Sequence, residues 1–190
     1  MKREIEATFL SIDKDNIRTK LKGIGFELKT LEYVMRRKTF DFPSSNVKKW
    51  GRVRQEFDKV TMTIKEIRGP GINDTYETEL IVNDFNTAVS FFEACGVREK
   101  AFQENKREVW VRGGVEVTID TWPGLQPFIE IESENEQKVR EVSSELNFDF
   151  TEAVFGSIDL IYEKELGVPS NLIIKLKEIT FANPPTKDNI

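Results

Sequence analysis

The feature of this sequence that most restricts its fold is a period-two alternation of charged residues with other side chains. It first occurs as Glu4-Ile5-Glu6, and it returns as Glu77-Thr78-Glu79 and as Glu130-Ile131-Glu132. Successive side chains of a β-strand point to opposite faces of the sheet, so the two carboxylates of each stretch lie on the same face. The chain is therefore expected to form strands with a strongly charged face.

The same parity sorts the remaining strand charges by sign. Arg52 and Arg54 share a face opposite Val53. On the next strand, Lys65 shares a face with two threonines. Asp120 lies on the same face of its strand as Glu116. Strands are predicted at residues 1–10, 31–42, 52–57, 59–66, 77–82, 107–111, 115–120 and 128–132. Bases are thus expected on the central strands and acids on the outer ones.

Helices are predicted where apolar residues recur at helical spacing after a capping residue. One begins at about Asp13 and ends near Gly25, a second follows Asp84, and a third follows Ser133. A fourth is predicted after Thr151, with Val154, Ile158, Ile161 and Tyr162 on one stripe. Because hairpin turns dominate and no alternation of strand and helix builds a parallel sheet, the predicted class is α+β.

The composition excludes several classes of site. The chain of 190 residues has no histidine and one cysteine, so mechanisms that need histidine, disulfides within the chain and cysteine-based metal sites are excluded. A net charge of −5 argues against a nucleic-acid coat. The sequence has neither a signal-peptide pattern nor a membrane-spanning stretch, so a cytoplasmic protein is expected. Whether the chain forms a homodimer is left open.

Two arrangements are consistent with the charged faces. One is an antiparallel sheet with a solvated face, which is common among proteins at large. The other is a sheet that curls into a barrel, with the charged faces directed into a polar tunnel where arginines hold phosphate oxygens. Carboxylates could face the same polyanion only across a divalent cation, and oxygen ligands favour Mg²⁺ or Mn²⁺. This second arrangement predicts a metal site at Glu4, Glu6, Glu130 and Glu132.

The order of these motifs resembles the CYTH superfamily, the triphosphate tunnel metalloenzymes that include class IV adenylyl cyclases and thiamine triphosphatases. Glu4-Ile5-Glu6 stands in the place of the ExExK signature. The motifs that follow in family order are Thr39-Phe40-Asp41, Arg52-Val53-Arg54, the Lys65 strand, Tyr76-Glu77-Thr78-Glu79, Lys106-Arg107-Glu108, Ile119-Asp120 and Pro127-Phe128-Ile129-Glu130-Ile131-Glu132. The resemblance extends to about Glu165.

The resemblance implies an eight-stranded, closed, tunnel-like antiparallel β-barrel with flanking helices over residues 1–165. Residues 166–190 would be a C-terminal extension that packs on the barrel or trails from it. The implied metal ligands are Glu4, Glu6, Asp120, Glu130 and Glu132. The implied triphosphate-binding residues are Arg52, Arg54, Lys65, Lys106 and Arg107. Catalytic roles fall to Glu4, Glu6, Lys65 and Asp120, and Glu77 and Glu79 are further tunnel acids.

The sequence departs from the family pattern at two cationic positions. Thr8 replaces the lysine of ExExK, and Asn105 stands where a lysine often precedes the arginine by two residues. Cations at residues 36–38 could compensate, although parity directs only some of them inward. The expected activity is a metal-dependent adenylyl cyclase or triphosphatase reaction on a small-molecule triphosphate. A non-catalytic triphosphate or polyphosphate binder and a barrel without ligand remain the alternatives.

Overall fold

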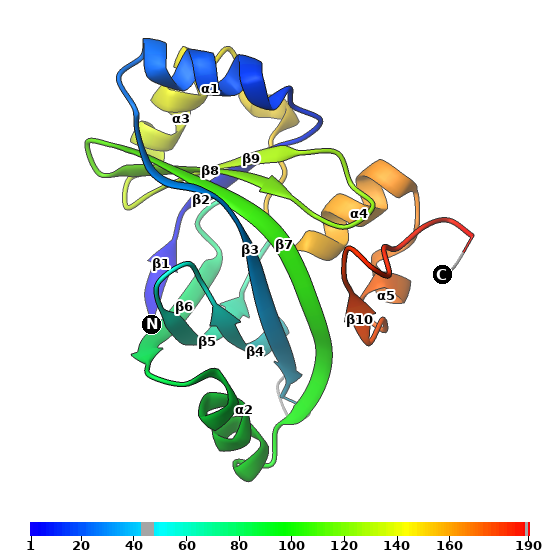
Figure 1. Ribbon diagram of the computed structural model, residues 1–190. Helices are drawn as coiled ribbons and strands as arrows, with labels where there is room; N and C mark the ends of the chain where they lie inside the picture. The colour runs from blue at the N-terminus through cyan, green and yellow to red at the C-terminus, as the bar shows by residue number, and fades with distance from the viewer. Residues whose placement is uncertain (43–47, 189) are drawn as a thin grey trace.

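An antiparallel sheet curls nearly closed into a barrel, a short C-terminal strand joins it in parallel, and helices lie on its outside (Figure 1). The computed structural model describes residues 1–42, 48–188 and 190. Its elements, in chain order, are β1 (Lys2–Glu4), β2 (Glu6–Phe9), α1 (Lys14–Gly23), β3 (Glu27–Asp41), β4 (Lys48–Gln55), β5 (Val60–Ile67), β6 (Thr75–Val82), α2 (Phe85–Ala94), β7 (Arg98–Arg112), β8 (Val115–Thr121), β9 (Phe128–Ser133), α3 (Glu136–Glu145), the 3₁₀ turn η1 (Phe150–Glu152), α4 (Ile158–Leu166), α5 (Ser170–Ile173) and β10 (Glu178–Ile179).

The N-terminal strand brings the two edges of the sheet together. The strand order is β1-β6-β5-β4-β3-β7-β8-β9-β2, so β1 pairs with one edge and β2 with the other. The break lies at Ile5, whose carbonyl still accepts a hydrogen bond from the Ser133 amide at 3.1 Å. The predicted α+β antiparallel barrel is confirmed. Among the described residues its strand path has nine members in place of eight, because the first predicted strand is divided.

Two 15-residue strands, β3 and β7, form the long wall of the barrel and are longer than the sequence pattern predicts. The first half of β7 reads Arg98-Glu99-Lys100-Ala101-Phe102 and carries no clear alternation of apolar residues. Its pairing with β3 runs from Glu27 to Asp41 with three register shifts. Tertiary pairing, and not local pattern, therefore extends these strands.

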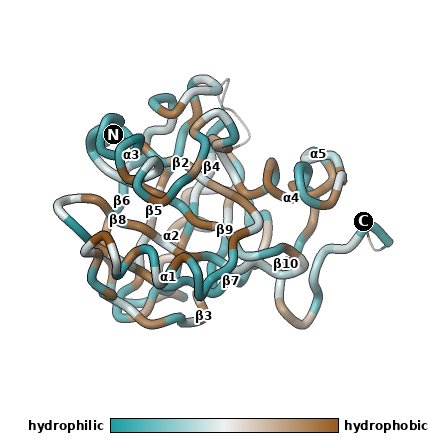
Figure 2. The backbone as a smooth tube through the Cα atoms, turned by 90° about the horizontal axis from the view of Figure 1, so that it is seen from above, coloured by the Kyte–Doolittle hydropathy of each residue, from teal (hydrophilic) through white to brown (hydrophobic). Residues whose placement is uncertain are grey.

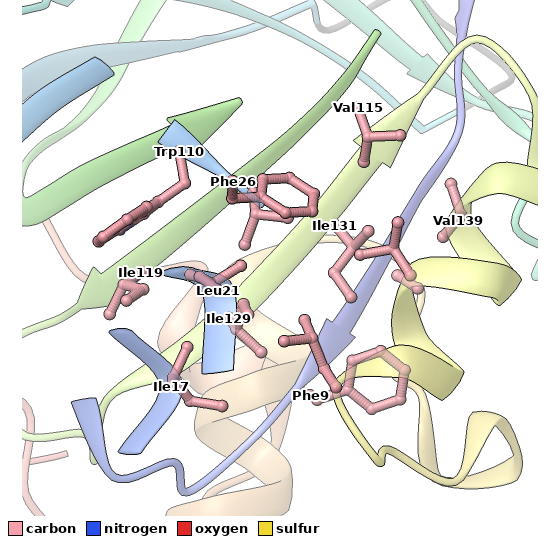
Figure 3. Close-up of a cluster of buried hydrophobic side chains, with 14 of the residues drawn as sticks. Phe9, Ile17, Leu21, Phe26, Trp110, Val115, Ile119, Ile129, Ile131 and Val139 are labelled. Atoms are coloured by element: carbon pink, nitrogen blue, oxygen red, sulfur yellow. The ribbon is translucent and has the colours of Figure 1, made fainter. Parts of the chain in front are cut away.

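One face of the barrel wall packs against α1 and α3. Apolar side chains of β2, β8 and β9 meet Leu21 of α1 and Val139 of α3 in the largest buried cluster, which Figure 3 shows. The Asp13 side chain accepts the Asn16 amide at 2.8 Å and Asn135 caps α3 in the same manner, so α1 begins where the sequence predicts and α3 begins three residues after Ser133. These two helices therefore pack on the outer, apolar faces of the acidic strands.

A second cluster packs α2 against the basic strands. Phe92 of α2 lies against Phe40 of β3, with ring centroids 4.8 Å apart, and Val53 of β4 is fully buried beside them. The Asp84 side chain caps α2 through the Thr87 amide at 2.7 Å, as predicted. This packing fixes the outer face of β4, whose inner face carries Arg52 and Arg54.

The C-terminal segment packs beside the barrel and corrects one helix prediction. Val154 forms a β-bridge with Thr8, and the helix that was predicted after Thr151 begins only at Ile158, after Gly156 at a φ of 122°. Figure 2 shows α4, α5 and β10 grouped on one side. The buried Tyr162 hydroxyl donates to the Pro123 carbonyl at 2.6 Å.

The division of the chain at residue 165 remains a prediction. No helix within the described residues is both long and apolar enough to cross a bilayer.

The contact between β4 and α2 predicts the effect of one small substitution. A Cβ on Gly51 would lie 3.0 Å from the Phe92 ring, so Gly51→Ala should lower the free energy of unfolding by about 1–3 kcal/mol. Gly23 of α1 has no atom within 4 Å of its Cβ position, so Gly23→Ala should be neutral or stabilising by up to about 1 kcal/mol. Urea unfolding of both variants tests this, and an unchanged Gly51→Ala protein would contradict the packing.

Candidate functional site: a charged tunnel

The inward faces of the strands surround a cavity of about 750 Å³, within the usual range for small-molecule sites. Its lining includes charged side chains from nearly every strand of the barrel. They are Lys2, Glu4, Glu6, Arg37, Asp41, Lys48, Lys49, Arg52, Arg54, Glu56, Lys59, Lys65, Glu77, Glu79, Lys100, Arg107, Glu116, Glu130 and Glu132, with Asp159 from α4. The solvated-sheet interpretation therefore does not apply, because the charged faces of these strands line one cavity inside the curled sheet.

Three carboxylates meet where the N-terminal strand closes the barrel. Glu4 ends β1, Glu6 begins β2, and Glu132 of β9 lies directly opposite Glu6 in the strand register. One carboxylate oxygen of each lies within 4.8 Å of the others. Burial and the neighbouring carboxylates Glu4 and Glu130 raise the pKa of Glu6 well above its ordinary value. Burial and Glu4 raise the pKa of Glu132 to about 7. This acidic cluster therefore needs a cation before all of its members ionise.

Lys65 joins the acidic cluster to the basic strands. Its ammonium lies 2.5 Å from both carboxylate oxygens of Glu4 and 3.8 Å from Glu77. Burial alone would raise the pKa of Glu4, but the charge of Lys65 holds that pKa below its ordinary value. Burial lowers the pKa of Lys65, but the carboxylates around it, Glu4 first and then Glu6 and Glu77, together raise it above its ordinary value. Within the cluster, Lys65 thus favours the charged form of Glu4.

Two arginines of β4, Arg52 and Arg54, line the tunnel. The buried Arg52 is 3.8 Å from Glu79 and bonds Thr63 at 3.5 Å, and its Nε has no hydrogen-bond partner among the described residues. Arg54 donates twice to one oxygen of Glu56, at 2.9 and 2.6 Å. Burial and the adjacent Arg54 lower the pKa of Arg52 to about 10. Such a pair of crowded guanidinium groups matches an anionic ligand.

Arg107 organises a separate network on β7, β8 and β9. Its guanidinium bonds both oxygens of Asp120, at 2.9 and 2.5 Å, and one oxygen of Glu130 at 2.6 Å. Asn105 donates to the same Asp120 at 2.8 Å. Burial opposes the charge of Arg107, but Asp120 and Glu130 raise its pKa well above the ordinary value. Asp120 is fully buried beneath this network, and Glu130 lines the cavity.

The structure therefore divides the predicted metal ligands into two groups. Glu4, Glu6 and Glu132 lie together, whereas Asp120 and Glu130 are engaged by Arg107. The predicted tunnel acids Glu77 and Glu79 line the cavity beside the basic strands, where Thr63 donates to Glu79 at 2.9 Å.

Lys106 does not join the site. It was predicted to bind phosphate, but Asn105 and Arg107 of the same strand point inward, so parity directs Lys106 to the outer face. There its ammonium lies 5.3 Å from the centre of the Phe181 ring. Adjacency in sequence to Arg107 was a misleading signal, since neighbouring residues of a strand cannot share a face.

Arg37 is a tunnel residue that the predicted site did not include. It lines the cavity from β3, next to Arg54 in the strand register, and is 7% exposed. Thr8 is also buried, opposite Glu130, and brings no charge. Strand parity could have selected Arg37 from the run at residues 36–38, but only with the exact register of β3.

The raised pKa of Glu132 predicts how stability depends on pH without metal. Between pH 4.5 and 7 the unfolded chain has lost this proton and the folded chain retains it, so folding takes up a proton. In chelator, the free energy of unfolding should fall as pH rises from about 4.5 to about 7, and the fall should be smaller in Glu132→Gln. Urea unfolding at a series of pH values tests this, and equal slopes for both proteins would contradict it.

Comparison with known proteins agrees with this geometry. The chain is similar to a conserved hypothetical protein from Pyrococcus furiosus, at 25% identity and a TM-score of 0.66 over 79% of this chain and 94% of that one. It is also similar to a Vibrio parahaemolyticus structure assigned as an adenylate cyclase, at 15% identity, a TM-score of 0.72, and 85% and 98% coverage. A third is HpAC1 from Hippeastrum, named an adenylyl cyclase with a dominant triphosphatase activity, at 14% identity, a TM-score of 0.58, and 90% and 99% coverage.

The last two likenesses, at such low identity, concern the fold alone. A search of curated proteins found no match. The model of the CYTH domain matches residues 3–157, which is most of the chain. The protein belongs to the CYTH domain family.

Proposed function

We propose that this protein is a divalent-metal-dependent enzyme that acts on a small-molecule triphosphate. The observation that carries the proposal is the placement of the acidic cluster and the arginines of β4 on the walls of one cavity. Membership of the CYTH family supports it, as do the adenylyl cyclase and triphosphatase descriptions of structural neighbours.

The charges of the tunnel match a polyanion with an accompanying cation. Arg52, Arg54 and Lys65 can donate to phosphate oxygens, and guanidinium groups match that ligand well because they donate in pairs. The carboxylates of Glu6 and Glu132 would repel the same ligand unless a divalent ion lay between them. The donor set consists of carboxylate oxygens, which suits Mg²⁺ or Mn²⁺. The acidic cluster therefore fits the metal that the proposal requires.

The residues of the site would act by holding and neutralising the substrate. Arg52 and Arg54 would hold phosphate oxygens as charge shifts to the leaving group, an electrostatic effect that accounts for much of phosphoryl-transfer catalysis. Lys65 would bridge the acidic cluster and the phosphate chain. When bound at Glu4, Glu6 and Glu132, the metal would polarise a phosphoryl group. Asp120 would act indirectly, by positioning Arg107 through its two hydrogen bonds.

The reaction itself is one of two that use the same tunnel. A hydrolase transfers the terminal phosphoryl group to water, whereas a cyclase joins the ribose 3′-hydroxyl to the α-phosphate and releases pyrophosphate. Incubation with ATP and with inorganic triphosphate, each with Mg²⁺ and with Mn²⁺, distinguishes them when phosphate, pyrophosphate and cyclic AMP are all measured. Formation of any of these products in a metal-dependent manner supports the proposal, and the absence of all three contradicts an enzymatic role.

A non-catalytic triphosphate or polyphosphate binder is the second candidate. The observation that favours it is the neutral residue at Thr8 and at Asn105, where the family resemblance leads one to expect lysines. Both residues are buried in the tunnel wall and uncharged, so neither position supplies a cation. A binder would be stabilised by triphosphate but would form no product.

Substitutions in the acidic cluster test the metal assignment. Glu6→Gln and Glu132→Gln should each weaken Mn²⁺ binding at least tenfold, because each removes a charged oxygen ligand, while the fold is retained. Glu134→Gln is the matched control, since this residue is exposed, two positions from Glu132, and pairs only with the exposed Lys2 among the described residues. Calorimetry with Mn²⁺ measures all three. Undiminished affinity in the two cluster variants would refute the site.

A lysine placed at residue 8 tests whether the tunnel has been rebuilt around a neutral side chain. Thr8 lies opposite Glu130, which already accepts a bond from Arg107 at 2.6 Å. In Thr8→Lys the new ammonium would compete for Glu130 and repel Arg107, so turnover should fall by roughly a factor of ten, or about 1.4 kcal/mol. Thr78→Lys adds the same charge on an exposed outer position and should leave turnover unchanged. A large gain of activity in Thr8→Lys would favour the binder.

A further inference from the structure

Arg37 differs from the other tunnel arginines in its lack of an acidic partner. Arg52, Arg54 and Arg107 each have a carboxylate within 4 Å, whereas no ion pair joins Arg37 to any carboxylate in the part of the chain that the structure describes. Its Nε also has no hydrogen-bond partner there. A buried guanidinium without a counter-charge is destabilising, since burial removes its hydration and nothing replaces it.

The side chain of Arg37 is nevertheless held in a defined position. One terminal nitrogen donates to the Asn105 side-chain oxygen, and the guanidinium lies 4.7 Å from the centre of the Trp122 ring. Asn105 is itself fixed by its bond to Asp120. A cation over an aromatic face is attracted to it but keeps its edge free to donate. Arg37 is therefore oriented by neutral groups, and it forms no ion pair of its own among the described residues.

The neighbours of Arg37 make its position still less favourable for a cation without a ligand. Arg37 faces Arg54 across the register of β3 and β4, and like charges in directly opposed positions repel. Burial, together with the charges of Arg52, Arg54 and Arg107, lowers the pKa of Arg37 well below its ordinary value. An anion in the tunnel would relieve this repulsion.

We infer that Arg37 is a phosphate-binding residue of the tunnel, whose charge is balanced by a phosphoryl group of the triphosphate and which Trp122 and Asn105 hold in place. This inference rests on the proposed function and adds a residue to it. It also explains how the site retains positive charge although Thr8 and Asn105 are neutral: Arg37 of β3 supplies a cation where these two positions do not.

The sequence offers a matched control for this role. Arg36 is the adjacent arginine on the same strand, but it is exposed on the outer face, where its guanidinium lies 5.5 Å from the Phe85 ring centre. Arg36→Gln and Arg37→Gln thus remove the same charge from the same strand at positions inside and outside the tunnel. Arg52→Gln serves as the reference for loss of a phosphate contact.

The test is calorimetric binding of inorganic triphosphate to the wild-type protein and to the three variants. Arg37→Gln and Arg52→Gln should each weaken binding about tenfold or more, the scale of a charge-assisted hydrogen bond, whereas Arg36→Gln should bind within about twofold of wild type. Binding to Arg37→Gln that equals wild type, while Arg52→Gln loses affinity, would overturn this inference alone. If the wild-type protein does not bind triphosphate, the proposed function fails as well.

A thermal-unfolding measurement separates a ligand-binding role from a structural one. Without ligand, Arg37→Gln should unfold at the wild-type temperature or above it, because it removes an uncompensated buried cation. Inorganic triphosphate should then raise the unfolding temperature of this variant less than that of wild type. Arg37→Lys retains the charge but not the paired donors, so its affinity for triphosphate should lie between those of wild type and Arg37→Gln. A ligand-free Arg37→Gln protein that unfolds well below wild type, with an undiminished response to triphosphate, would show that Arg37 is structural.

Discussion

The closure of the sheet by one divided strand is the constraint on which the rest of the structure depends. The break at Ile5 lets β1 pair with β6 and β2 pair with β9, so the same short segment joins both edges. It also brings Glu4 and Glu6 together with Glu132, because both members of the alternating pair face inward. Without closure these carboxylates would lie on a solvated face, where water would satisfy them and their pKa values would stay ordinary.

Closure places opposite charges in one low-dielectric cavity. The acidic wall is then stabilised by a bound cation, and the basic wall by a bound anion. Burial and the neighbouring carboxylates raise the pKa values of Glu6 and Glu132, whereas burial and the adjacent Arg54 lower the pKa of Arg52. Lys65 links the two walls through its contact with Glu4 at 2.5 Å. A divalent cation with a phosphate chain would satisfy both walls at once, which is the physical reason to regard the metal and the triphosphate as a coupled pair.

Strand parity carried most of what the sequence could predict. It placed Glu4, Glu6, Arg52, Arg54 and Lys65 on shared faces, and the structure brings all of them to one cavity. It could not show the break at Ile5 or the length of β7, since tertiary pairing determines both. Lys106 was assigned to the site because it is adjacent to Arg107, although strand parity places adjacent residues on opposite faces. Arg37 was not selected because three consecutive cations at residues 36–38 do not show which of them faces the tunnel. The sequence pattern likewise did not show the 3₁₀ turn at Phe150–Glu152 or the bridge between Thr8 and Val154 that follows it.

The most direct measurement of the central claim is the affinity for inorganic triphosphate in Mn²⁺ compared with its affinity in chelator. Mn²⁺ neutralises part of the charge of triphosphate, so a tunnel that bound its ligand through cationic side chains alone would bind the metal complex more weakly than the free anion. The acidic cluster reverses this order if it shares the metal with the ligand. We therefore expect the wild-type protein to bind triphosphate more tightly in Mn²⁺. Equal or weaker binding in Mn²⁺ would contradict it.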